Sequence, residues 1–288
     1  MKPSIRRPAV AGLFYPIDAL DLRSDVEKML AGASPIDTDV RPRILIVPHA
    51  GYVYSGPVAA TGYRLLAGLD GLRRVVMLGP SHYVPFSGLT LPGVDLMQTP
   101  LGVVALDSEG VAELLDDPLV ENSPEAHQRE HSLEVQLPFL QVVAPGVAVV
   151  PMLTGALEPE AASVVIEPLL DDRTMLLISS DLSHYHDATT ARRLDAETVA
   201  AIKRLDPAGL GREAACGRTG IQIALHIAAR RAYRVVVLDL RNSADTAGAA
   251  DRVVGYPCIV LGECANRRLD VPLVEADGLP ARPPISRL

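Results

Sequence analysis

Three short apolar runs, each followed within six residues by a histidine, place the strongest constraint on the fold of this chain. They are residues 44–47 before His49, residues 75–78 before His82, and residues 175–178 before His184. Each run holds only Val, Ile, Leu or Met, which is typical of strands buried on both faces of a parallel sheet. Ligands of open α/β sheets bind beyond the carboxyl ends of the strands. The pattern therefore predicts a group of histidines at one edge of such a sheet.

Helical patterns alternate with these strands along most of the chain. Predicted helices cover residues 18–30, 57–69, 108–116, 130–143, 159–170, 188–205 and 218–231. Predicted strands cover residues 43–48, 74–78, 147–153, 174–179, 233–240 and 252–262, with a hairpin within 83–106 and a polar loop at 123–128. This alternation predicts the α/β class, with a central mixed, mostly parallel sheet and helices on both faces. We expect a single domain over residues 1–265 and a poorly ordered, proline-rich tail over 266–288.

Composition and charge exclude several classes of protein. The net charge of −8 and the lack of a basic run argue against a nucleic-acid partner. No apolar run approaches the length of a membrane span, and the apolar stretch 9–15 is too short for a signal peptide. The three cysteines are scattered and form no disulfide pattern, so we expect a reducing cytoplasm as the location.

The histidines after the apolar runs are candidate ligands or catalysts. His49 and His82 follow neighbouring strands, and neutral imidazole is a common ligand of Fe, Cu and Zn. The alternative is that they are hydrogen-bonded loop residues. Asp181 follows the third run and would either fix the tautomer of a nearby histidine or act as a ligand. His184 would be a third ligand or a general base.

Two further segments carry candidate side chains. His131 and Glu134 lie three residues apart on a predicted helix, either as a metal pair, as residues behind the ligands, or as exposed polar groups at a helix start. Cys216 precedes the helix predicted from residue 218, and thiolates at helix N-termini are favoured and bind soft metals. The alternatives there are an anion bound by Arg218 with free backbone N–H groups, and a buried, inert cysteine.

Six ordered motifs together resemble those of one protein family. They are PHAGY at 48–52, GPSH at 79–82, TPLG at 99–102, EHSLEVQLP at 130–138, SSDLSH at 179–184 and CGR at 216–218. In this order and over about residues 7–262, they resemble the Memo family, also called AmmeMemoRadiSam system protein B. The resemblance implies the fold of class III extradiol ring-cleaving dioxygenases, the LigB-like fold.

The resemblance also implies a site. It places a metal between His49, His82 and Cys216, with His184 as the acid/base histidine and Asp181 beside it. Tyr54, His131, Glu134 and Arg218 are expected to line the pocket. Because the related dioxygenases have a carboxylate where this chain has Cys216, the softer thiolate implies Fe(II) or copper, with zinc as a substitute.

Three functions are compatible with such a site. The first is metal-dependent redox chemistry, and the second is extradiol-type cleavage of an unknown phenolic substrate. The third is a non-catalytic module that binds a peptide or protein in the same pocket. The ligand is expected to be a small molecule or a peptide, and the family's name implies AMMECR1-like and radical-SAM proteins as partners.

Overall fold

The α/β fold predicted from the alternating pattern is confirmed. The structure is a computed structural model that describes residues 2–33, 36–69 and 71–271. The α-helices are α1 (Ala19–Gly32), α2 (Tyr52–Ala67), α3 (Ser108–Leu115), α4 (Pro124–Gln128), α5 (Leu137–Val143), α6 (Pro159–Ile166), α7 (Ala188–Lys203) and α8 (Arg218–Arg230). The strands are β1 (Ile5–Arg6), β2 (Ile36–Val47), β3 (Arg74–Pro80), β4 (Leu89–Leu91), β5 (Leu96–Thr99), β6 (Gly102–Ala105), β7 (Val120–Asn122), β8 (Ala148–Thr154), β9 (Thr174–Ser179), β10 (His184–His186), β11 (Arg234–Asn242) and β12 (Val253–Val271).

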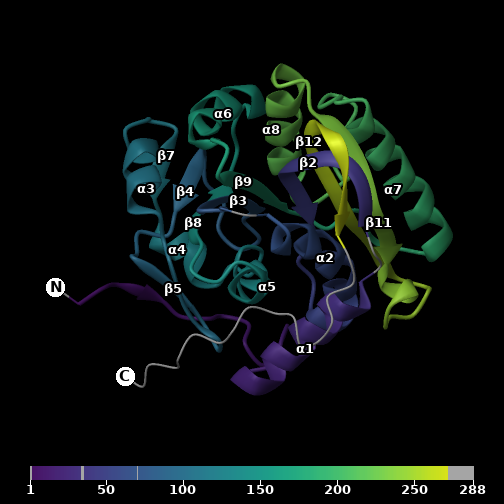
Figure 1. Ribbon diagram of the computed structural model, residues 1–288, viewed down its shortest axis with the longest axis horizontal. Coiled ribbons are helices and arrows are strands. Elements are labelled where there is room, and N and C mark those ends of the chain that lie inside the picture. The colour runs from purple at the N-terminus through teal and green to yellow at the C-terminus, as the bar shows by residue number, and fades with distance from the viewer. Residues whose placement is uncertain (1, 34–35, 70, 272–288) are drawn as a thin grey trace.

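One mixed sheet forms the centre of the molecule (Figure 1). Its order is β10-β12-β2-β9-β3-β8-β4-β7, with β11 also paired to β12. The four central strands β2, β9, β3 and β8 are parallel, and β12 and β4 join them antiparallel on either side. The parallel strands therefore end together at one edge, as the histidine pattern requires.

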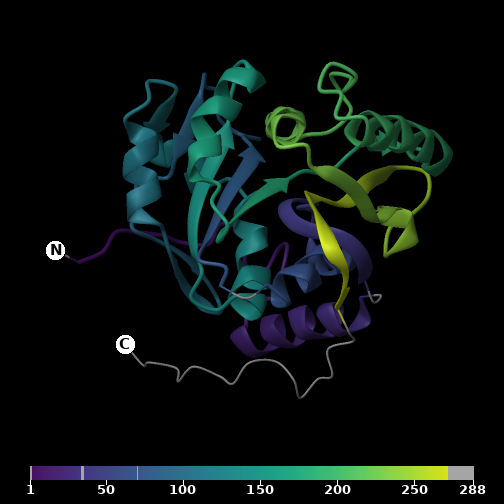
Figure 2. The same cartoon turned by 45° about the horizontal axis from the view of Figure 1, so that its top comes forward.

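Helices cover both faces of this sheet, which explains the apolar runs at 44–47, 75–78 and 175–178 in its central strands. In β2, Leu45 and Val47 belong to one apolar cluster and Ile44 and Ile46 to the other, and all four are fully buried. Helices α1, α2 and α5 pack on the first face, and α6, α7 and α8 on the second. Figure 2 shows the purple α1 and the green α7 and α8 on opposite sides of the sheet.

Three local expectations were wrong. The helix expected at 57–69 begins earlier, at Tyr52, because the Tyr52 N–H donates to the Phe14 carbonyl and the chain turns into helix there. The helix expected from residue 130 is a turn at 130–133, followed by a 3₁₀ turn (Glu134–Gln136) and α5. The expected loop at 123–128 contains α4, which Ser123 caps through the N–H of Ala126.

The C-terminal boundary expected at residue 265 falls inside a strand. β12 continues to Val271, and its residues 269–271 pair with residues 36–38 of β2. The remainder of the expected tail, 272–288, lies outside the described residues. A small sheet of β1, β5 and β6 contains the hairpin expected within 83–106. Among the described residues, no helix is both long and apolar enough to cross a bilayer.

Candidate metal centre

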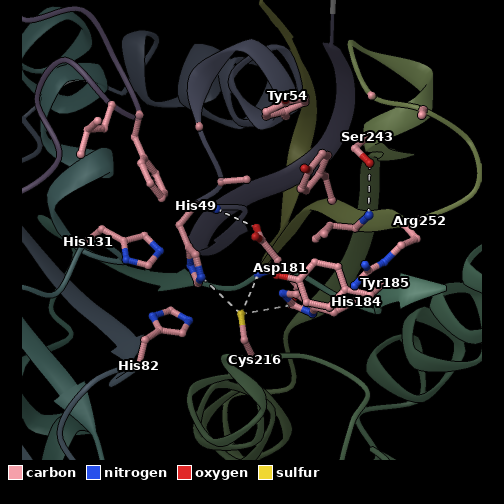
Figure 3. Close-up of a pocket in the computed structure, with 18 residues that line it drawn as sticks. His49, Tyr54, His82, His131, Asp181, His184, Tyr185, Cys216, Ser243 and Arg252 are labelled. Atoms are coloured by element: carbon pink, nitrogen blue, oxygen red, sulfur yellow. Dashed lines mark hydrogen bonds between the residues drawn. The ribbon is translucent and has the colours of Figure 1, made fainter.

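The carboxyl ends of three adjacent parallel strands carry the central side chains of the site. β2 ends two residues before His49, and β3 ends two residues before His82. Between them in the sheet lies β9, which leads directly into Ser180 and Asp181. These neighbours converge because parallel strands end at the same edge (Figure 3).

A cavity of about 790 Å³ opens over this edge. Its lining combines histidines, one carboxyl, one thiol and several aromatic rings. The residues are Leu13, Phe14, His49, Ala50, Gly51, Tyr54, His82, His131, Asp181, His184, Tyr185, Cys216, Ser243, Gly248, Ala249, Arg252, Val254 and Tyr256.

Three histidines on one side of the cavity form a group that can hold a metal ion. One ring nitrogen from each of His49, His82 and His131 lies within 4.8 Å of the other two. Among the described residues, this is the one such group of three metal-ligating side chains. The rings of His82 and His131 stack with centroids 4.7 Å apart, and His49 meets His82 edge-on at 5.3 Å.

The tautomer of His49 is set by a hydroxyl behind it. Ser179 Oγ donates its hydrogen to the Ser132 carbonyl and accepts one from Gln136 Nε2 at 2.8 Å. His49 Nδ1 lies 2.9 Å from the same oxygen, which has no second hydrogen to offer. Nδ1 must therefore be the donor, and Nε2 keeps its lone pair for the cavity. Burial, with His82 and His131 nearby, holds the pKa of His49 well below its usual range, so the ring is neutral.

Glu130 orients His82 in the same way. Its Oε1 lies 2.9 Å from His82 Nδ1, and its Oε2 accepts the backbone N–H of His82. Burial raises the pKa of Glu130, but the hydrogen bonds from His82 and Ser132 outweigh it and lower the value to about 2. Because the ionised carboxylate can only accept, Nδ1 of His82 donates and Nε2 is left free. Such a carboxylate–histidine pair is the usual support of a metal-ligating imidazole.

His131 is placed by the turn that replaced the expected helix. Glu130 Oε1 accepts the N–H groups of His131 and Ser132, both at 2.8 Å, and so holds the backbone out of a helix. Gly79 lets this turn approach β3, since a Cβ at that position would lie 2.6 Å from Ser132 Oγ. His131 Nδ1 is buried and has no hydrogen-bond partner among the described residues. An orphaned buried imidazole nitrogen is unfavourable unless a ligand occupies it.

Cys216 lies on the opposite side of His49 from that turn. Its Sγ is 3.3 Å from His49 Nε2 and accepts the N–H of Asp181 at 3.2 Å. Gly217 allows this approach, because a Cβ there would meet Ser180 Cβ at 2.6 Å. Burial, together with the Asp181 carboxyl, raises the pKa of Cys216 to about 12. The group is therefore a thiol at neutral pH until a cation replaces its proton.

Asp181 and His184 supply groups that can exchange protons with the cavity. Burial raises the pKa of Asp181 to about 7, although the N–H of His49 donates to its Oδ1. Burial also lowers the pKa of His184, which keeps that ring neutral. His184 comes from β10, where Tyr185 forms a bulge between the pairs His184–Val254 and His186–Val253. The bulge turns the adjacent side chains of His184 and Tyr185 to the same cavity.

The other expected pocket residues are divided between the cavity and the protein interior. Tyr54 lines the cavity from the first turn of α2. Glu134 does not line it, because its fully buried carboxylate binds Arg6, the Tyr15 hydroxyl and the N–H groups of residues 9 and 10. Arg218 does not line it either, and its Nε donates to the Leu210 carbonyl at 3.0 Å.

The sequence patterns did not reveal several residues of the site. The sequence pattern places Glu130 only at a helix start, although an acidic residue directly before His131 is a signal for a carboxylate that supports a histidine ligand. Phe14, which packs on His131 with centroids 4.7 Å apart, comes from the N-terminal segment. Tyr185 comes from β10, Arg252 from the loop before β12 and Tyr256 from β12 itself, and no quoted motif includes any of them.

Comparisons with known proteins identify the family of this chain. The family described as "Memo-like protein" matches residues 6–260. A MEMO1 family protein of Aquifex aeolicus is 36% identical over 264 residues, which cover 88% of this chain and 97% of the relative. MEMO1 family proteins of Ignicoccus hospitalis, 35% identical over 280 residues, and Methanopyrus kandleri, 36% identical over 284 residues, each match over 88% of this chain and 98% of the relative.

One solved structure is also similar. It is the crystal structure of an uncharacterized protein from Escherichia coli K12, with a TM-score of 0.49 and 13% sequence identity. The alignment covers 76% of this chain and 100% of that chain.

Proposed function

This chain belongs to the Memo family, and we propose that it binds one redox-active transition-metal ion through His49, His82, His131 and the thiolate of Cys216. The observation that carries the proposal is the group of three imidazole nitrogens within 4.8 Å of one another, with a sulfur 3.3 Å from one of them. Imidazole and thiolate together suit iron, copper and zinc better than magnesium or calcium.

The state of each ligand supports the proposal. Hydrogen bonds donated by Nδ1 of His49 and His82 leave their Nε2 lone pairs available. The buried Nδ1 of His131 makes no hydrogen bond with any described residue, although Glu130 Oε1 lies 3.5 Å away. The pKa values of His49 and His131 are both lowered, mainly by burial, so a metal would not have to displace protons from them at neutral pH. A cation bound by Nδ1 of His131 would remove the cost of leaving that buried nitrogen without a hydrogen bond.

Iron or copper would supply one-electron chemistry at this site, whereas zinc would not. Two neighbouring residues would transfer protons. Neutral His184 would act as a general base that accepts a proton from a bound substrate, and Asp181, with a pKa of about 7, would hold a proton or donate it as a general acid. Tyr54 and Phe14 would shield the substrate from water. We place the protein in the cytoplasm, where reducing conditions keep the oxidisable thiol of Cys216 intact.

Proton release tests the role of Cys216. Titrating Zn²⁺ into metal-free protein at pH 8 under argon is expected to release about one proton per bound ion, because free imidazoles are already neutral at that pH. Calorimetry in two buffers of different ionisation enthalpy measures this number. The apparent affinity is expected to rise about tenfold per pH unit below the thiol pKa of about 12.

Cys216→Ser provides the comparison. The variant should still bind Zn²⁺ through its three histidines, but more weakly and with no proton released at pH 8. Zinc binding to the wild type without proton release would show that Cys216 is not a ligand. Failure of the wild type to bind Zn²⁺, Fe²⁺ or Cu⁺ would contradict the whole proposal.

A further inference from the structure

Arg252 offers a free positive charge to the cavity, on the side away from the three histidines (Figure 3). The side chain is exposed, and its guanidinium carbon lies 5.1 Å from the centre of the Tyr185 ring. No residue in the described part of the chain forms a hydrogen bond or ion pair with it. This guanidinium therefore has all its N–H donors available for a ligand.

The positive charge of Arg252 lies in a chain whose other charges are negative on balance. The whole chain carries a net charge of −8. Among the described residues that line the cavity, Arg252 is the one lysine or arginine and Asp181 the one carboxyl. Asp181 is buried, and His49 N–H donates to it, so it is not an ion-pair partner of the guanidinium. An anion is thus attracted to this end of the cavity on a surface that otherwise repels it.

The strand pair that carries His184 also positions Arg252. Arg252 directly precedes β12, and the next two residues, Val253 and Val254, pair with His186 and His184. Tyr185 forms the bulge between these pairs with a φ of 62°, in the left-handed region that a non-glycine residue occupies at a cost. That strained residue supplies the ring under the guanidinium. A cation–π contact limits the freedom of the arginine without using any of its donors.

Aromatic and apolar side chains line much of the remaining wall. Tyr54, Tyr185, Tyr256 and Phe14 face the cavity, whose volume of about 790 Å³ is in the range that holds a drug-sized molecule. The cavity thus has metal-ligating groups at one end, rings along its walls and a planar cation at the other end. A guanidinium fits a carboxylate or phosphate with two parallel hydrogen bonds.

We propose that the substrate is an elongated molecule with an aromatic or apolar body and an anionic group, and that Arg252 binds that carboxylate or phosphate. The end opposite the anion approaches His49, His82 and His131. This inference rests on the proposed function, because the metal fixes which end of the molecule reacts. Arg252 is then a specificity-determining residue of the same site.

Matched hydroxamates test the proposal, because a hydroxamate oxygen can bind zinc as a fifth ligand beside the four protein ligands. The probes are benzohydroxamates that carry a para carboxylate on zero, one or two methylenes, their uncharged primary amides, and the corresponding phosphonates. Zinc-loaded wild type is expected to bind at least one anionic probe about tenfold or more tightly than its amide, as for a charge-assisted hydrogen bond. The comparison of carboxylate with phosphonate identifies the anion. Arg252→Met should abolish the preference, and Arg252→Lys should restore part of it.

Arg23→Met is the matched control, because Arg23 lies on α1 outside the cavity lining and pairs with Glu27. It makes the same change of charge and should keep the wild-type preference. Equal affinity of zinc-loaded wild type for all anionic probes and their amides overturns the inference, as does a preference that persists in Arg252→Met. Metal analysis of the same samples separates the two proposals: protein without zinc contradicts the metal site, whereas zinc-loaded protein without anion preference contradicts the role of Arg252 alone.

Discussion

His82→Ala is expected to bind Zn²⁺ or Fe²⁺ more than ~100-fold more weakly than the wild type, beyond the usual cost of removing a residue that only supports a ligand. His82 contributes one of the three clustered nitrogens, and Glu130 holds its ring in place. Its side chain is 29% exposed, so truncation leaves a small cavity and the fold should survive. Competition with a chromophoric chelator, after anaerobic purification, measures the affinity.

His184→Ala is the matched control for that loss. His184 is also a histidine of the cavity lining, but it lies outside the group of three. This variant should keep its metal affinity within a few-fold of the wild type. Equal metal binding by His82→Ala and the wild type would show that the clustered histidines are not the ligands. Circular dichroism of both variants would exclude unfolding as the cause of any loss.

Glu134→Gln is expected to reduce the free energy of unfolding by about 3–5 kcal/mol, the usual cost of breaking a buried ion pair. The Glu134 side chain has no solvent exposure, and that of its partner Arg6 is 6% exposed. The amide would leave the Arg6 charge uncompensated and would place its NH₂ group against donors from residues 9, 10 and 15. A chain of this size should then melt roughly ten degrees lower. Denaturant and thermal unfolding of the metal-free protein measure both quantities.

Glu197→Gln gives the comparison for that prediction. Glu197 pairs with Arg193 on α7, and both side chains are 62% exposed. Because exposed ion pairs contribute little, this variant should stay within about 0.5 kcal/mol of the wild type. If Glu134→Gln changed the free energy of unfolding as little as Glu197→Gln, the buried pair of Arg6 and Glu134 would not hold the N-terminal segment, including Phe14, against the site.

Part of the fold was predictable because strands buried on both faces appear in the sequence as uninterrupted apolar runs. The run at 175–178 is apolar throughout since its alternate side chains belong to the two apolar clusters on opposite faces of the sheet, and the expected strand 174–179 matches β9. The stretch after residue 130 was not predictable from periodicity. There the Glu130 carboxylate binds the next two N–H groups and replaces a helical turn, which is a competition between side chain and backbone.

The candidate site was predictable where it depends on strand ends. His49 follows β2 and His82 follows β3, and both strands pair in parallel with β9. Their side chains therefore converge at one edge of the sheet, as the fold class predicts. The local sequence made Cys216 a candidate ligand, and the family resemblance grouped it with His49 and His82. Arg252 and Tyr256 were not identified. Arg252 comes from the loop before β12 and Tyr256 from β12 itself, and both reach the cavity only because β12 pairs antiparallel with β2 and β10. Local hydrophobic periodicity does not predict which strands, distant in the sequence, pair in the sheet.

Anomalous diffraction from crystals of the zinc-loaded protein, measured on both sides of the zinc absorption edge, tests the central claim most directly. We expect one strong site, with imidazole nitrogens of His49, His82 and His131 at about 2.0–2.1 Å and Cys216 sulfur at about 2.3 Å. A zinc site elsewhere on the protein, or an empty histidine cluster in crystals that contain zinc, would contradict it.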